Sequence, residues 1–434
     1  MAAKRDLRTY LNEAYPKTSD RLPDGVVNAF NGPYRAYYAI GYWRYLVAAL
    51  LMATIPILME PSILGDFFPA LEDSVADLES PIPYLTGGFG IRVLVMTGIW
   101  ILLALGLSVV VGMAGLLDLG YVAFFMLGAY TTAFMTESGG ADQFHIVVWP
   151  NVAALPFAIL VCVLAGVALG IPTLRLRGDY LAIVTLGFHE IVRQSANNLT
   201  ITNGSRGIPG IERPDLGLPE SWGEFAVLSS HNYWFFLLIP AIILAVIMIR
   251  HLEDSRVGRY WTAIREDEVA AAAMGVPVVK MKVLAFAIGA STSGVAGWIF
   301  AGYATFISPN NFPLLYSILI LCAVVIGGLG SISGAVLGAV LVQGLPEVVR
   351  EASGGRTIFG FDPETGRIAV FGFLLVIVMI FRPGGLLAPR RRRIELSEAG
   401  AAEGVIVDET AQASEDEIEY ARSVHEASQR KEGD

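Results

Sequence analysis

The chain has 434 residues, of which 54% are hydrophobic and 16% are charged, and its mean hydropathy is +0.57. Soluble domains carry about a quarter charged residues, so this composition excludes an ordinary soluble protein and indicates an integral membrane protein. The net charge of −10 comes mainly from residues 395–434, which hold twelve Asp or Glu and three Lys or Arg. The remaining body is nearly neutral and lacks a basic patch with interleaved aromatic residues, which argues against nucleic acid as a partner.

The N-terminal arm, residues 1–42, is rich in Lys and Arg, and the segment after the first apolar run contains Asp and Glu but no Lys or Arg. By the positive-inside tendency, this arm is cytoplasmic. A membrane-spanning helix needs about 20 apolar residues, and the chain holds about ten such runs. The predicted spans are 43–59, 91–111, 119–135, 151–174, 180–197, 233–249, 283–303, 314–325, 332–349 and 368–381.

The predicted fold is therefore an all-α integral membrane protein of about ten transmembrane helices, including broken or half helices, with both termini cytoplasmic. The transmembrane domain covers residues 43–388. Residues 389–434 form a basic cytoplasmic anchor and an acidic tail whose composition is typical of disorder. The glycine-rich connection at 327–331 leaves two readings of 314–349 open, as two passes or as a re-entrant pair.

A glycine-punctuated turn at 112–118 precedes the third span, and Asp118 is its carboxylate. We predict that Asp118 caps the N-terminus of the helix beginning at Leu119, since hydrocarbon cannot satisfy those amides. The alternative is a direct role in gating or solute passage, because ionisable groups inside membranes tend to be functional.

Glu190 lies ten residues after Tyr180, which on a helix is about 15 Å and close to the middle of the bilayer. A carboxylate at that depth needs a partner or a water-filled cavity. Arg193 is in position to pair with it, whereas His189 lies on a different helix face. A locked ion pair and a polar lining of a pathway both fit this pattern.

A charged segment at 251–282 separates two long apolar runs and lies on the cytoplasmic side by the same topology. We predict one helix from Gly258 to Gly275, closed by that glycine and by Pro277. The segment is either a solvated connection or a helix that docks on another protein. The residues expected on one side of this helix are Tyr260, Ile264, Ala271 and Met274.

Gly-Lys does not occur in the sequence, so no phosphate-binding loop of the common ATPase type is present and any ATP-driven work belongs to another polypeptide. Cys162 and Cys322 lie in apolar runs, and the five histidines lack metal-ligand spacing. No catalytic constellation stands out. The sequence therefore predicts a chain that is not an enzyme and binds no cofactor or metal.

Five motifs occur in the order that is characteristic of one family. They are GLLDLGYVAFFMLGAY (115–130), GDYLAIVTLGFHEIVR (178–193), VGRYWTAIREDEVAAAAMGV (257–276), VVIGGLGSISG (324–334) and FRPGGLL (381–387). Together they resemble the LivM-type permeases of branched-chain amino-acid ABC importers, over residues 90–388. His189 is a departure from the resemblance, since a small residue is expected there.

The resemblance implies a subunit of the bacterial plasma (inner) membrane, surrounded by lipid and paired with a second, LivH-like permease. Two cytoplasmic ATPases would hydrolyse ATP, and an extracytoplasmic binding protein would deliver Leu, Ile or Val. The family's coupling loop corresponds here to Gly258, Arg259, Ala263, Arg265, Glu266, Asp267, Glu268, Ala271 and Gly275, which would seat in a groove of the ATPase. Candidate pathway or gating residues are Asp118, Tyr121, Glu190 and Ser331.

Three other functions are weighed against this one. Permeases for urea or short-chain amides are similar overall, but a serine is expected in the urea permeases where this chain has Asp118. A secondary transporter driven by an ion gradient would need several ionisable groups in the membrane, and this chain offers mainly Asp118 and Glu190. A membrane scaffold or sensor would leave the coupling-like loop unexplained.

Overall fold

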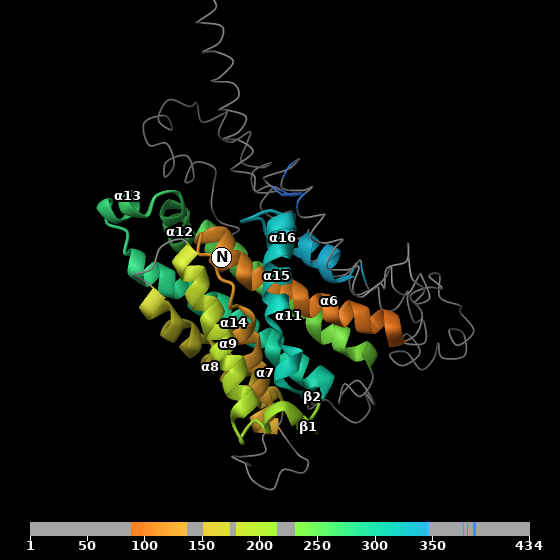
Figure 1. Cartoon of the computed structure of the whole chain (residues 1–434). Helices are drawn as coiled ribbons and strands as arrows, with labels where there is room; N and C mark the ends of the chain where they lie inside the picture. The colour runs from red at the N-terminus through yellow and green to blue at the C-terminus, as the bar shows by residue number, and fades with distance from the viewer. Residues whose placement is uncertain are drawn as a thin grey trace, which may run out of the picture.

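The computed structural model describes residues 88–136, 151–173, 179–214 and 231–344, the single positions 346, 376 and 380, and the segment 385–387. Within these residues the chain is almost entirely helical, as predicted (Figure 1). The N-terminal arm, the span at 43–59, most of the span at 368–381, the basic anchor and the acidic tail lie outside the described residues, so those predictions stay predictions.

The first described span consists of α6 (Gly88–Leu107) and a π-helical turn (Ser108–Met113). It is apolar around its whole circumference, which is typical of a helix enclosed by protein, and most of its residues are buried. The chain then turns at Gly115, which has φ +71°. A short non-helical segment leads to α7 (Val122–Thr136), which confirms the predicted turn between the two spans.

The next three helices lie close to the ranges of predicted spans. They are α8 (Asn151–Thr173), α9 (Asp179–Asn198) and α11 (His231–Asp254), and α11 continues five residues beyond the predicted end at 249. Two short helices, α12 (Arg256–Glu266) and α13 (Glu268–Ala273), connect α11 to α14 (Val278–Ala304).

Helix α14 lies at the centre of the bundle and packs against α6, α7 and α8. A Cβ atom on Gly297 would lie 2.6 Å from the Phe125 carbonyl oxygen and 2.7 Å from the Ala129 amide nitrogen of α7. A Cβ on Gly289 would lie 3.3 Å from the Gly106 carbonyl oxygen of α6. Glycines on this helix therefore let α6 and α7 approach it closely.

Helices α15 (Leu314–Gly327) and α16 (Ile332–Ala339) form an antiparallel hairpin, and a second π-helical turn (Val340–Gly344) extends α16. The two helices touch through glycine, since a Cβ on Gly338 would overlap the Ala323 carbonyl group. The predicted glycine-rich connection is thus a tight reversal, and Gly328 and Gly330 in it have φ +124° and +82°.

One small sheet was not predicted. Strand β1 (Ile208–Pro209), from the polar segment after α9, pairs antiparallel with β2 (Phe306–Ile307), directly after α14. The 3₁₀ turns Gly204–Arg206 and Pro309–Asn311 flank it. This sheet lies at one end of the bundle, and α12 and α13 lie at the opposite end (Figure 1).

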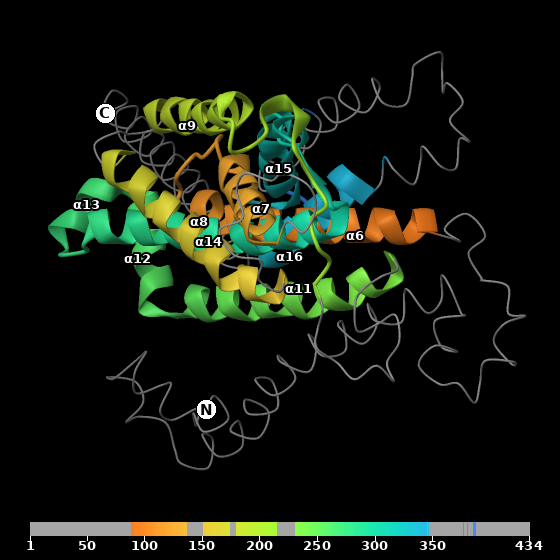
Figure 2. The same ribbon diagram turned by 90° about the horizontal axis from the view of Figure 1, so that it is seen from below.

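Four apolar stretches among the described residues are long enough to cross a membrane, which identifies a multi-pass membrane protein. They are Arg92–Met113, Asn151–Pro172, Val278–Ala304 and Pro309–Gly327. Helix α9 lies along one edge of the bundle and α11 along the opposite edge (Figure 2).

Candidate coupling surface and pathway face

The chain turns sharply between α11 and α12 (Figure 2). Ser255 caps α12, because its hydroxyl oxygen accepts hydrogen bonds from the amides of Val257 (3.1 Å) and Gly258 (3.3 Å). A Cβ on Gly258 would lie 2.4 Å from the Leu252 carbonyl oxygen. Gly258, a predicted coupling residue, is therefore required by the turn itself.

The prediction of one helix from Gly258 to Gly275 is wrong, because the helix breaks at Asp267. This residue has φ −151° and ψ 111°, and its carboxylate accepts from the amides of Val269 (2.8 Å) and Ala270 (3.0 Å). An aspartate that bonds to the backbone just ahead of it competes with helix continuation. The two bonds, to Ala270 and to Val269, hold the pKa of the Asp267 carboxyl below its ordinary value.

The break changes the direction of α13 relative to α12. The four residues that were predicted to lie on one side of a single helix therefore do not lie on a common side. Ile264 and Ala271 are buried, whereas Tyr260 is 37% exposed and Met274 is 85% exposed. The prediction assumed that one helical repeat continues through residue 267. It could not give the observed exposures, because the helix axis changes at that residue.

The predicted end of the segment at Gly275 is confirmed. Gly275 has φ +85°, its amide donates to the Ala272 carbonyl at 3.0 Å, and the Val276 amide donates to the Ala271 carbonyl at 3.1 Å. This is the Schellman pattern that closes a helix at a glycine. It fixes where α13 ends and how the chain enters α14.

The charged residues of the segment have different surroundings. Glu266 is exposed, whereas the Glu268 carboxylate lies 2.7 Å from the Lys282 ammonium group at the start of α14. Lys282 is only 8% exposed, so this ion pair ties α13 to α14. Arg259 is exposed and donates to the Asp254 carbonyl at 3.2 Å. Arg265 reaches back toward the bundle and donates to the Gly112 carbonyl.

Sequence reasoning missed two features of this segment. Trp261 is fully buried, and its indole N–H donates to the Met281 carbonyl at 2.8 Å, which joins α12 to α14. Val269 (61% exposed), Met274 (85%) and Val279 (54%) are exposed apolar side chains in and next to the charged segment, and together they are called its apolar surface. Apolar residues interspersed in a charged segment were the available signal for that surface. We call α12, α13 and this apolar surface the coupling segment.

Asp118 is buried, but it does not cap α7, because that helix begins at Val122 and not at Leu119. Its carboxylate accepts from the Gly120 amide at 2.8 Å, while the Leu119 amide donates to the Thr185 hydroxyl of α9 at 3.0 Å. The predicted N-cap is therefore replaced by a local turn that holds α9 beside the start of α7.

Tyr121 and Ser331 have structural contacts in the described bundle. Tyr121 is fully buried, and its hydroxyl donates to the Gly289 carbonyl at 2.8 Å across the contact between α7 and α14. Ser331 caps α16 by accepting from the Gly334 amide at 3.1 Å. Their pathway roles stay predictions.

Glu190 pairs with Arg193 within α9, as the spacing indicated. The Arg193 Nη2 and Glu190 Oε1 atoms are 2.6 Å apart, and 48% of the Glu190 side chain is exposed. His189, next to it, is fully buried. The ion pair therefore sits on the outer side of α9, within one helix and not between two.

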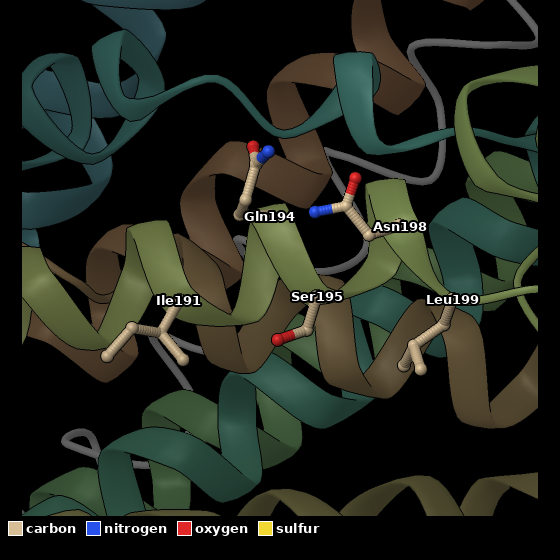
Figure 3. A pocket seen from close by; sticks show the side chains of 5 residues that line it. All are labelled: Ile191, Gln194, Ser195, Asn198 and Leu199. Carbon is tan, nitrogen blue, oxygen red and sulfur yellow. The ribbon is translucent and has the colours of Figure 1, made fainter.

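The outer face of α9 carries a mixed stripe of exposed residues along its whole length. Its C-terminal half borders an open hollow (Figure 3). Gly187 sits in the middle of the stripe, with nothing within 4 Å of a Cβ built on it. The hollow is lined by Ile191, Gln194, Ser195, Asn198 and Leu199. We call this surface the α9 face; its exposed members before the hollow are Tyr180, Ile183, Val184 and Glu190.

These observations define a class: a multi-pass helical membrane protein in which, within the described residues, a capped helical segment lies at one end of the bundle and a helix with exposed apolar and polar side chains lies along its side. A family model described as "Branched-chain amino acid transport system / permease component" matches residues 90–381. The chain belongs to this family.

Two similar relatives are the high-affinity branched-chain amino acid transport system permease proteins LivM of Salmonella typhimurium and Escherichia coli. Each is 39% identical over 339 residues, which cover 74% of this chain and 75% of the relative. The LivH permease protein of Salmonella typhimurium is 27% identical over 305 residues, covering 66% of this chain and 90% of LivH. No solved structure matches the chain.

Proposed function

We propose that this chain is the transmembrane permease subunit of an ATP-driven importer for leucine, isoleucine and valine. The observation that carries the proposal is the 39% identity to LivM proteins over three quarters of both chains. A second permease related to LivH completes the pathway, two cytoplasmic ATPases supply the energy, and an extracytoplasmic binding protein delivers the solute. The assembly belongs in a bacterial inner membrane.

The coupling segment is the surface that meets an ATPase. A segment that transmits force must be rigid, and this one is held by the Ser255 and Asp267 caps, by Trp261 and by the Glu268–Lys282 pair. Its apolar surface fits a groove in a partner, because buried apolar side chains carry most binding energy at protein interfaces.

The α9 face lines the pathway or contacts the second permease. A helix of membrane-spanning length that carries an exposed carboxylate is poorly suited to lipid, and such residues face a bundle interior or a water-filled cavity. Side chains such as Gln194, Ser195 and Asn198 offer weak hydrogen bonds to a passing amino acid. Weak contacts suit release, because a tight site in a pathway would slow transport.

The proposal is tested in proteoliposomes that contain this chain with its LivH-like partner, the two ATPases and the binding protein. We expect uptake of labelled leucine that requires ATP and is inhibited by isoleucine and valine. Uptake of urea in place of leucine would show a urea permease. Uptake by this chain alone, driven by an ion gradient without ATP, would show a secondary transporter.

Asp267 offers a sharper test of how the coupling segment acts. Asp267→Asn keeps a side chain that caps helices well, whereas Asp267→Ala removes the cap and its two hydrogen bonds to the amides of Val269 and Ala270. We expect leucine uptake to fall with Ala and to stay close to wild type with Asn. Equal loss in both variants would mean that the charge contacts the ATPase directly and that the cap is not the important feature.

Glu266→Lys tests an exposed charge of the same segment and should reduce both uptake and ATPase stimulation while the complex still assembles. Glu268→Lys is less informative, because it also breaks the pair with Lys282. Normal uptake with Glu266→Lys would mean that Glu266 takes no part in coupling to the ATPase.

A further inference from the structure

The C-terminal end of α12 is fixed to the turn that ends the first described span. The Arg265 guanidinium donates to the Gly112 carbonyl, and the side-chain stem lies on Gly115. A Cβ on Gly115 would lie 2.8 Å from Arg265 Cγ and 3.1 Å from its Cβ. Gly115 also has φ +71°, so glycine serves both the turn and the close approach of the arginine.

The same arginine also touches the reversal between α15 and α16. A Cβ on Gly330 would lie 3.2 Å from Arg265 Nη1, and a Cβ on Gly112 would lie 2.6 Å from the Gly330 amide nitrogen. The two glycine turns are therefore in direct backbone contact, and Arg265 lies against both of them.

A fourth segment closes on this reversal from the C-terminal part of the chain. The Leu386 amide donates to the Ile326 carbonyl and the Leu387 amide to the Gly327 carbonyl, both at 2.9 Å. A Cβ on Gly385 would lie 2.4 Å from Gly328 Cα. Four of the five sequence motifs described above therefore converge here. We define the glycine junction as Gly112, Gly115, Gly328 and Gly330 together with residues 385–387.

We infer that Arg265 is a positioning residue that locks the coupling segment to the glycine junction, so that displacement of α12 moves the ends of α6, α15 and α16 together. This rests on the proposed function as an ATPase-driven permease. Backbone contacts through glycine leave little room for one segment to move without the next, since packed interiors transmit strain. Arginine suits this role because its planar, permanently charged group presents several donors in fixed directions.

The inference changes what Arg265 is expected to do. The family resemblance places it on the surface that seats in the ATPase. Arg265 is exposed, but its guanidinium donates to a carbonyl of this chain's own turn. Removing it should therefore leave the ATPases bound and weaken the link between their cycle and the movement of the spans.

The test compares the ATP hydrolysed per leucine imported by the assembled complex. We expect Arg265→Ala to raise this ratio about tenfold, the scale of residues that carry coupling between sites. Arg265→Lys, which keeps the charge but not the fork of donors, should give an intermediate ratio. Arg206→Ala is the control, since Arg206 is an exposed arginine in the 3₁₀ turn beside β1, at the end of the bundle opposite to the coupling segment, and its ratio should stay within about twofold.

Gly112→Ala disturbs the glycine junction without changing Arg265, because its methyl group would push against the Gly330 backbone. Two changes at one junction should not add, so the double variant should be no worse than the more severe single variant. Gly98→Ala in α6 is the control, since the atoms nearest to its Cβ position are methyl groups of Leu238 and Ile242, which belong to flexible side chains.

Hydrogen exchange gives a readout that does not depend on transport. In Arg265→Ala the amides of 112–118 and 327–331 should both exchange faster than in wild type. A wild-type ratio in Arg265→Ala, unchanged exchange at both turns, or loss of the ATPases from the purified variant complex would each overturn the inference. If the wild-type complex imports no branched-chain amino acid, the proposed function fails first, and with it the coupling role.

Discussion

Helices α14 and α9 run through the same bundle but differ in how their sides are covered. About two thirds (67%) of the most apolar stretch of α14 is buried by the rest of the chain. On α9, Tyr180 (70%), Ile183 (64%) and Ile191 (67%) are exposed. Among the described residues, the core is therefore completed around α14, whereas these side chains of α9 stay exposed and are available for the partner contact proposed above.

Helix α8 shows that an uncovered helix is not by itself a partner surface. Only 28% of its apolar stretch is buried, and its exposed residues include Leu160, Leu164 and Ile171. A uniformly apolar outer side fits lipid. The α9 face combines exposed apolar side chains with Glu190, Gln194 and Asn198, which do not fit lipid, and this difference in polarity separates the two surfaces.

The largest expected effect comes from filling the contact between α14 and α7. Gly297→Ala places a methyl group 2.6 Å from a backbone oxygen of α7, which cannot turn aside as a side chain can. Overpacking of this kind costs about 1–3 kcal/mol. We expect a lower melting midpoint and less monodisperse protein after detergent extraction. A midpoint at or above wild type would show that the two helices are not in tight contact.

A smaller loss is expected for Tyr121→Phe at the same helix contact. The change leaves the ring in place and removes the hydroxyl that donates to the Gly289 carbonyl and pairs with the Thr292 hydroxyl. Loss of one buried hydrogen bond costs about 1 kcal/mol. Chemical denaturation should show this loss while uptake per folded complex stays unchanged. Reduced uptake at unchanged stability would instead support a pathway role for Tyr121.

The sequence anticipated α14 better than it anticipated the segment before it. Apolar runs and the spacing of Gly289, Ser293 and Gly297 are repeated signals along one helix, so the span and its close contacts could be predicted. The break at Asp267 depends on one side chain that bonds to two amides, and helix periodicity does not report it. The β1–β2 pair joins segments about 100 residues apart, which local patterns cannot reveal.

The candidate site, too, could be predicted from the sequence only where the signal lies within one helix or segment. The charges of the coupling segment were visible in the sequence, but their partners were not, because Lys282 and Gly112 lie on other elements. Pairing of Glu190 with Arg193 was predictable, since the two residues are three apart on one helix. The location of that pair on an uncovered side needed the three-dimensional packing of α9.

Gly187→Ala should show the opposite sign from Gly297→Ala. Nothing lies within 4 Å of a Cβ at Gly187, and alanine favours a helix over glycine by up to about 1 kcal/mol. The isolated subunit should therefore be equally stable or slightly more stable. If the second permease packs on the α9 face, the added methyl group should weaken assembly of the pair, measured by co-purification. A destabilised isolated subunit would mean that this chain covers the α9 face itself.

The smallest effect on stability is expected for changes to the Glu190–Arg193 pair. These changes test whether the α9 face borders lipid or instead borders water or protein. Exposed ion pairs three residues apart contribute about 0.2–0.5 kcal/mol, so Glu190→Gln should barely change the melting midpoint. It leaves the Arg193 charge unbalanced at the α9 face, which should reduce leucine uptake. The double change to glutamine removes both charges and should import more than Glu190→Gln alone. If both variants import as wild type does and still co-purify with the second permease, the pair lies outside the pathway and the permease contact, and the α9 face loses its functional assignment.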